Sequence, residues 1–216
     1  MGWIFTFLRH AESVGNAQGI RQGQGDLPLT EAGRAATHDL AQRWRRAGLT
    51  FDALLTSPLQ RASETAGILA RTLTLPAPEI DSLLMERDIG AFTLRPAAEV
   101  RQNEPAFLAL YDPVGGTGES MWDLYVRAGR VVAGLTQRPP GRYLVVSHGM
   151  LLNMVLYALL GITPQPNFHG PLFALPNLGA AVVIRSQIPR YRRWVLMHLA
   201  GPDCLPPRIP SGPDGS

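Results

Sequence analysis

The stretch "WIFTFLRH", residues 3–10, is an almost continuous apolar run that ends abruptly on Arg9 and His10. A short apolar run of this kind is typical of a strand buried on both faces of a sheet. Its end is unusual, because cationic side chains are costly to bury unless something compensates their charge. The sequence therefore raises the question of which group compensates the positive charge at this end of the strand.

Two later stretches repeat the arrangement: "FDALLTSPLQR" (51–61) and "RYLVVSHGM" (142–150). In each, an apolar strand pattern ends on polar residues and a helix pattern follows. The polar side chains at these two junctions are Ser57, Arg61, Ser147 and His148. In parallel sheets, ligands bind at the carboxyl ends of strands, where helix N-termini also offer free N–H groups. We therefore expect the three junctions to meet at one edge of a sheet.

The rest of the chain alternates strand and helix patterns. A polar loop is expected over 14–29; helices are expected over about 30–46, 57–73, 96–111, 119–137 and 150–161, and further strands around 171–175, 179–186 and 192–199. This alternation predicts an α/β fold, a three-layer sandwich with a mostly parallel central sheet and helices on both faces. We expect one domain over 1–200, with 91–118 as a cap-like insertion, and a flexible Pro/Gly-rich tail over 201–216.

Composition excludes several function classes. The 216 residues carry a formal net charge of only +3, with no basic run interleaved with aromatic residues, so no nucleic-acid partner is expected. All 20 basic residues are Arg, which excludes Schiff-base chemistry and a phosphate loop built on Lys. Cys204 is the single cysteine, which excludes an internal disulfide or a cysteine-based zinc site. No metal and no cofactor is expected.

Nothing in the chain predicts a membrane partner. The apolar run at 3–8 is too short for a signal peptide, and no window approaches the length of a membrane span. "MGWIFT" fits the N-myristoylation pattern, but the same residues make a buried strand, so we attribute the match to chance. We expect a cytoplasmic protein, with a homodimer left open.

A cluster of two Arg, two His and two helix starts repels itself unless an anion lies within it. A phosphoryl group fits, because Arg offers a bidentate donor and His offers one more. Each residue also has an ordinary interpretation. A single His is more often a satisfied polar side chain, and a single Arg more often lies on the surface. Their joint position at three strand ends is what favours a phosphoryl site, and the expected partner is a small phosphorylated metabolite.

Six short motifs occur in a recognisable order: "LRHAES", "GDLPLTEAG", "TSPLQRASETA", "LLMERDIGAF", "GES" and "VVSHG". Together they resemble the histidine phosphatase superfamily, whose best-known branch is the cofactor-dependent phosphoglycerate mutases. The resemblance extends from about residue 4 to residue 199 and implies a phosphoglycerate mutase-like fold.

The resemblance implies a role for each matching residue. His10 would be the nucleophile that takes the phosphoryl group, and Glu86 the general acid and later the base that activates water. The residues expected to hold the phosphoryl group are Arg9, Arg61, His148, Asn16, Gln22 and Gly149, and those with a supporting role are Glu119 and Ser120. Ala11 stands where most relatives have Gly. A positive φ at that position would displace His10.

Three functions follow from the resemblance. The first is a phosphomonoesterase that works through a phosphohistidine on His10, the second a phosphoglycerate mutase, and the third a non-catalytic phosphate-binding relative. Glu86-Arg87 resembles the mutase branch, whereas Ile89, Met150 and the lack of an adjacent Arg pair between residues 90 and 119 depart from it. We therefore favour a phosphatase that transfers the phosphoryl group to water. No G-x-S-x-G is present, so a serine-hydrolase triad is disfavoured.

Overall fold

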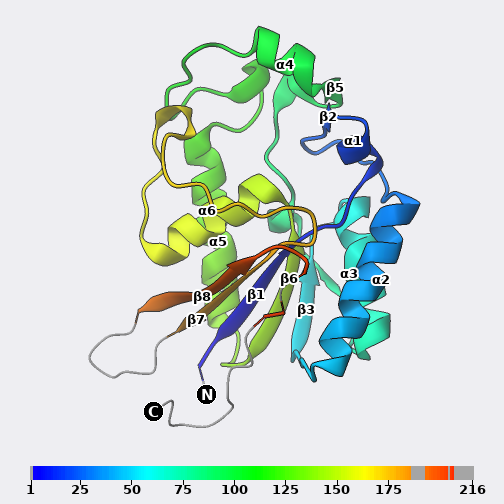
Figure 1. Cartoon of the computed structure of the whole chain (residues 1–216). Coiled ribbons are helices and arrows are strands. Elements are labelled where there is room, and N and C mark those ends of the chain that lie inside the picture. The colour runs from blue at the N-terminus through cyan, green and yellow to red at the C-terminus, as the bar shows by residue number, and fades with distance from the viewer. Residues whose placement is uncertain (1, 186–192, 204, 207–216) are drawn as a thin grey trace.

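The computed structural model describes residues 2–185, 193–203 and 205–206. At its centre lies a six-stranded sheet in the order β4-β3-β6-β1-β7-β8, with helices on both faces (Figure 1). Neighbouring strands from β4 through β1 pair in parallel, whereas β7 is antiparallel to both β1 and β8. The predicted three-layer α/β sandwich with a mostly parallel sheet is confirmed.

The strands are β1 (Ile4–Arg9), β2 (Ile20–Arg21), β3 (Ala53–Thr56), β4 (Glu79–Ile80), β5 (Arg95–Pro96), β6 (Arg142–Ser147), β7 (Ala180–Arg185) and β8 (Trp194–Ala200). The α-helices are α1 (Val14–Ala17), α2 (Glu31–Arg46), α3 (Gln60–Leu73), α4 (Ala97–Asn103), α5 (Met121–Gln137) and α6 (Gly149–Leu160). Short 3-10 turns are η1 (Ser82–Leu84), η2 (Gly90–Phe92), η3 (Val114–Gly116) and η4 (Pro166–Phe168).

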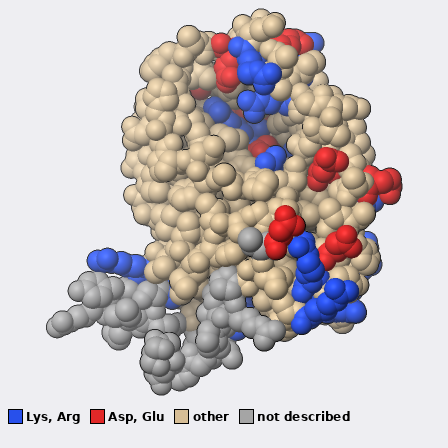
Figure 2. Space-filling view, in the orientation of Figure 1, with Lys and Arg blue, Asp and Glu red and all other residues tan. Residues whose placement is uncertain are grey.

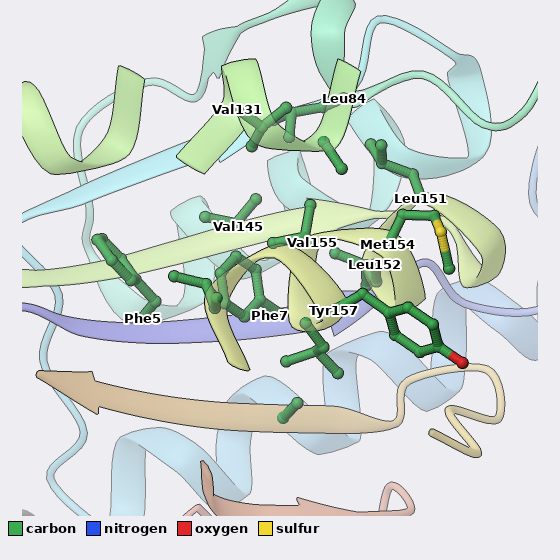
Figure 3. Close-up of a cluster of buried hydrophobic side chains, with 14 of the residues drawn as sticks. Phe5, Phe7, Leu84, Val131, Val145, Leu151, Leu152, Met154, Val155 and Tyr157 are labelled. Carbon is green, nitrogen blue, oxygen red and sulfur yellow. The ribbon is translucent and has the colours of Figure 1, made fainter. Parts of the chain in front are cut away.

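Strand β1 is mostly apolar because it has a core on each face. Phe5 and Phe7 point into one cluster of buried side chains, shown in Figure 3, and Leu8 points into the other. Strand β6 alternates in the same way, with Val145 on the first side and Val146 on the second. Since successive side chains of a strand point to opposite faces, two buried faces favour a nearly continuous apolar run.

Each core is closed by a pair of helices. Helices α5 and α6 cover the face that carries Phe5 and Phe7, and α2 and α3 cover the opposite face. The N-terminus of α2 is capped by Thr30, whose hydroxyl accepts from the Gly33 N–H, and α5 begins with a capping box between Ser120 and Asp123. These caps satisfy backbone donors that have no partner within the helix, and so they set where each helix begins.

We expect Gly33→Ala to destabilise the protein by about 2 to 3 kcal/mol, because a methyl group there has no room. A Cβ at Gly33 would lie 2.2 Å from the Glu12 carbonyl oxygen. Urea denaturation measures the loss. The matched control is Gly134→Ala on α5, where nothing lies within 4 Å of the new Cβ and a gain of up to about 1 kcal/mol is expected. Equal stabilities of the two variants would contradict the prediction.

Three predicted elements were wrong. The helix expected over 96–111 ends at Asn103, because the residue before Pro105 is disfavoured in the α conformation and Glu104 is extended. The strand expected over 171–175 is irregular. There the Asn153 side chain bonds both the N–H and the carbonyl of Phe173, in place of a neighbouring strand. The loop expected over 14–29 contains α1 and β2.

The remaining boundaries moved by a few residues. The helix expected from Ser57 begins at Gln60, with Leu59 at the N-cap position, because Ser57 still continues the path of β3. The two final strands and the helix that follows β6 lie within two residues of their expected positions. Cys204 and the expected tail from residue 207 onward lie outside the described residues.

The segment between η2 and α5 lies above the carboxyl ends of the strands, toward the top of Figure 1. It is tied to the loop after β1 by a two-stranded sheet, in which Ile20 pairs with Pro96 and Arg21 with Arg95. Leu94, with a φ of 61°, donates its N–H to the Arg21 carbonyl at 2.8 Å. The predicted cap region therefore closes over the loop that follows the first strand. Among the described residues, no helix is long and apolar enough to cross a membrane.

Candidate active site

The three polar strand ends lie side by side, as their positions in the sequence predict. Strand β6 lies between β1 and β3, with Arg9 opposite Ser147 in the parallel register. The Ser57 N–H extends the same pattern by donating to the Val146 carbonyl at 3.2 Å. The polar ends therefore converge because these three strands are neighbours in the sheet.

His10 is 3% exposed, and its backbone N–H donates to the Ser147 carbonyl at 2.9 Å. Its ring Nδ1 lies 2.7 Å from the Ala11 carbonyl oxygen. Since a carbonyl only accepts, Nδ1 carries the proton, and Nε2 keeps a free lone pair. Burial and then the Arg61 guanidinium hold the pKa of the imidazole well below its usual range, against the opposing effect of the Ala11 hydrogen bond. His10 is therefore a neutral base that lines a cavity.

Ala11 is accommodated without backbone strain. The φ of Ala11 is not positive. The residue is fully buried, and its N–H donates to Thr65 Oγ1 at 3.1 Å. Its methyl group belongs to the core between the sheet and helices α2 and α3. The methyl group therefore does not displace His10.

Two guanidinium groups flank His10. Arg61, which is 1% exposed, donates to the carbonyls of Gly23 and Gly25 at 2.8 Å each, and Arg9 donates to the Leu175 carbonyl at 2.8 Å. Burial lowers the pKa of both Arg side chains, and the Glu86 carboxylate acts in the opposite direction. The Nε atoms of both are buried without a hydrogen-bond partner among the described residues. The pair is thus fixed in place with its positive charge incompletely compensated.

His148 lies behind His10 rather than on the cavity wall. It is fully buried, and its ring centroid is 5.1 Å from that of His10. Its Nε2 contacts Ser57 Oγ at 2.8 Å, while Nδ1 has no partner among the described residues. Burial and then Arg61 hold the pKa of His148 well below its usual range.

Gly149 also does not line the cavity. A Cβ there would lie 3.7 Å from the Arg9 guanidinium.

Glu86 reaches the cavity from the segment after η1. Its carboxylate accepts from the N–H groups of Arg87, Met150 and Leu151 at 2.9, 3.3 and 3.2 Å. Two of these donors belong to the first turn of α6, where the positive end of the helix dipole favours an acidic group. The predicted acid and the predicted nucleophile therefore line one cavity, although 76 positions separate them in the sequence.

Asn16 and Gln22 line the same cavity. Asn16 Oδ1 accepts from the Ser13 N–H at 3.2 Å and from Asn177 Nδ2 at 3.1 Å, and Ser13 Oγ donates to Gln22 Oε1 at 3.0 Å. With both amide oxygens occupied, the amide nitrogens are the groups left to donate toward a ligand.

The cavity has a volume of about 570 Å³. It appears in Figure 2 as a hollow in the upper part of the molecule with basic atoms inside it. The apolar part of its lining is formed by Ile20, Ile89, Phe92, Val100, Leu108, Val114, Met150 and Phe168. Arg21, Arg87 and Glu104 also line it. Arg21 and Glu104 were missed by the sequence reasoning, since no pattern in the expected loop and cap distinguished them from solvated charges.

The two buried histidines predict an acid-sensitive fold. Folding keeps both rings neutral, whereas in the unfolded chain they bind protons below about pH 6.5. Stability is therefore full above that pH and is lost as the pH falls below it, by up to about 1.4 kcal/mol per pH unit for each ring. Urea denaturation between pH 7.5 and 5 measures the slope. His10→Gln should remove about half of it, and a variant with an unchanged slope would contradict this account; His38→Gln, at an exposed position, is the control.

Fold and site together define an α/β protein with a cavity at the carboxyl edge of its sheet, lined by His10, Arg9, Arg61 and Glu86. The sequence model of the histidine phosphatase superfamily (branch 1) matches residues 5–187. The chain belongs to this superfamily.

Individual proteins are similar to this chain in sequence or in fold. A probable phosphoglycerate mutase GpmB from Yersinia enterocolitica is 36% identical over 166 residues, which cover 73% of this chain and 75% of that protein. The structure of Bacillus stearothermophilus YhfR superposes with a TM-score of 0.76 at 25% identity, covering 91% of this chain and 96% of that one. A mycobacterial glucosyl-3-phosphoglycerate phosphatase in complex with VO3 gives 0.73 at 25% identity, covering 90% and 97%.

Proposed function

We propose that this protein is a phosphomonoesterase that hydrolyses a small phosphorylated substrate through a phosphohistidine on His10. The observation that carries the proposal is the set of buried nitrogens around the neutral His10. Arg9 Nε and Arg61 Nε belong to two side chains that line the cavity, and both atoms lack partners among the described residues. A tetrahedral oxyanion supplies the acceptors and the negative charge that these groups need. The mycobacterial phosphatase of the same fold binds VO3, an oxyanion.

The reaction has two balanced displacements. In the first, the lone pair of His10 Nε2 forms a bond to phosphorus, the bond to the substrate oxygen breaks, and the Glu86 carboxyl gives its proton to the departing oxygen. In the second, the Glu86 carboxylate takes a proton from water, the water oxygen bonds to phosphorus, and the phosphorus–nitrogen bond breaks. Inorganic phosphate leaves, and His10 is neutral again. The Ala11 carbonyl holds the His10 tautomer that the first displacement requires.

Hydrolysis is favoured over mutase chemistry by the character of the cavity. A mutase must retain a small, doubly anionic product while the phosphoryl group returns to it. Here Ile89, Phe92 and Met150 line the same cavity as His10. These three apolar side chains give such a product no polar contact, so we expect its release and transfer of the phosphoryl group to water.

The test is hydrolysis of p-nitrophenyl phosphate, followed as release of both p-nitrophenol and inorganic phosphate. Acid-labile label transferred from the substrate should appear on His10. If the wild-type protein binds vanadate but turns over no phosphomonoester in a broad metabolite panel, the proposal is wrong, and a non-catalytic phosphate-binding role replaces it.

A second candidate is phosphoglycerate mutase activity. The curated relatives named probable phosphoglycerate mutase favour it, and so does Arg87, whose guanidinium lines the cavity and donates through Nε to the Glu119 carbonyl at 2.9 Å. Conversion of 3-phosphoglycerate to 2-phosphoglycerate in the presence of bisphosphoglycerate measures this activity. Conversion faster than the hydrolysis of any ester in the panel would make the protein a mutase.

A further inference from the structure

The segment that carries Glu86 has almost no secondary structure of its own. Turn η1 ends at Leu84 and the next element begins at Gly90, so residues 85–89 belong to no helix or strand. The carbonyls of this partly buried backbone must find hydrogen-bond partners outside regular secondary structure. How this stretch is held decides where the proposed general acid lies.

Arg127, on α5, bonds the carbonyls of Glu86 and of the residues just before it. Its Nη1 donates to the carbonyls of Leu83 and Met85 at 2.8 and 2.7 Å, and its Nη2 donates to the carbonyl of Glu86 itself at 3.1 Å. One guanidinium thus bonds three carbonyls within four consecutive residues. Only a planar, multiply donating side chain can do this, and an ammonium group of Lys presents a different geometry.

Glu119 fixes Arg127 and reaches the other side of Glu86. Its carboxylate accepts hydrogen bonds from Nε and Nη2 of Arg127 at 2.7 and 2.6 Å, which makes the pair bidentate. It also accepts from the Asp88 N–H at 2.9 Å. The side chains of the pair are 14% and 19% exposed. The pair therefore bonds the chain both before and after the proposed acid while lying outside the cavity wall.

We infer that Arg127, oriented by Glu119, is the positioning residue for Glu86, and that it acts on leaving-group protonation rather than on phosphate binding. The inference rests on the proposed function. Two further bonds, from Ser147 Oγ to the Leu84 carbonyl and from Gln24 Nε2 to the Glu86 carbonyl, do not involve Arg127. The segment therefore stays attached without Arg127, but the carboxyl loses its fixed position.

The experiment compares kcat/KM for two aromatic monoesters in the full-length protein. This constant covers the steps through departure of the leaving group. p-Nitrophenolate leaves without a proton, whereas the alkoxide of benzyl phosphate needs one. For Arg127→Met we expect kcat/KM to fall about 10²-fold with benzyl phosphate and to stay within about threefold with p-nitrophenyl phosphate. Arg127→Lys should show the same selectivity with a smaller loss, and it carries the test if the Met variant does not fold.

Two controls separate positioning from a general structural role. Arg130→Met removes an exposed Arg from the same helix and should leave both substrates unchanged. In a Glu86→Gln background, Arg127→Met should cause almost no further loss with benzyl phosphate, because the group it positions is already inactive. Equal losses with both substrates, or additive losses in the double variant, overturn the inference. A wild-type protein that hydrolyses neither ester overturns the proposed function itself.

Discussion

His10→Ala is expected to lower kcat/KM for p-nitrophenyl phosphate by at least about 10⁴-fold, because it removes the nucleophile of the proposed covalent route. No other described histidine can replace it. His148 lies behind it, away from the cavity wall, and its Nε2 is engaged by Ser57. The variant should also fail to become labelled by a substrate that labels the wild-type protein.

The matched control for this prediction is His38→Ala, on the exposed face of α2. It should leave turnover and labelling unchanged. Vanadate affinity gives an independent check. His10→Ala keeps Arg9 and Arg61, so it should still bind the anion while turning over no ester. Turnover by His10→Ala close to that of the wild type would eliminate the phosphohistidine mechanism.

Arg61→Met is expected to lower kcat/KM by about 10³-fold and to weaken vanadate binding. The buried guanidinium supplies charge beside His10, and it also holds the carbonyls of Gly23 and Gly25. These two glycines lie under the cap: a Cβ at Gly23 would lie 2.5 Å from the Ile89 side chain, and one at Gly25 would lie 2.6 Å from that of Leu94. Loss of Arg61 therefore affects both the anion site and the loop that forms its wall.

Arg61→Lys distinguishes charge from geometry. It keeps the positive charge but cannot bond both carbonyls with a planar fork, so we expect a loss of at least about 10²-fold. Arg71→Met, at an exposed position near the end of the same helix, is the control and should behave like the wild type. Steady-state kinetics and vanadate titration check both. An Arg61→Met variant within tenfold of the wild type would show that this residue does not hold the phosphoryl group.

Most of the sheet could be predicted because its strands carry their own signal. The apolar runs ending at Arg9, Ser57 and Ser147 are buried on both faces. Burial on both faces is recognisable from a sequence because it needs apolar residues at consecutive positions. The cap was predicted less well, since its fold depends on distant partners. Pro105 stops α4 early, and the backbone around Leu108 is instead bonded to Asn167, from a part of the chain 59 residues away.

The residues of the site also differ in how far the sequence could identify them. His10, Arg9, Arg61 and Glu86 could be named from motifs, because each stands next to a recognisable strand end, helix start or short signature. Arg127 could not. It stands in an ordinary amphipathic helix, and nothing in its neighbours distinguishes it from a surface Arg such as Arg130. Its contacts with three carbonyls exist only because α5 packs beside the Glu86 segment.

The sequence by itself determined which strands form the centre of the sheet and which reactive side chains stand at their ends. The tertiary structure decided the state of those side chains. Burial is the larger cause of the lowered pKa of His10, and the Arg61 charge is the second. Burial depends on packing from distant segments, including the Leu175 carbonyl that holds Arg9 and the cap above the first loop. The pattern of a single strand specifies which faces are covered, but only the assembled fold specifies what covers them.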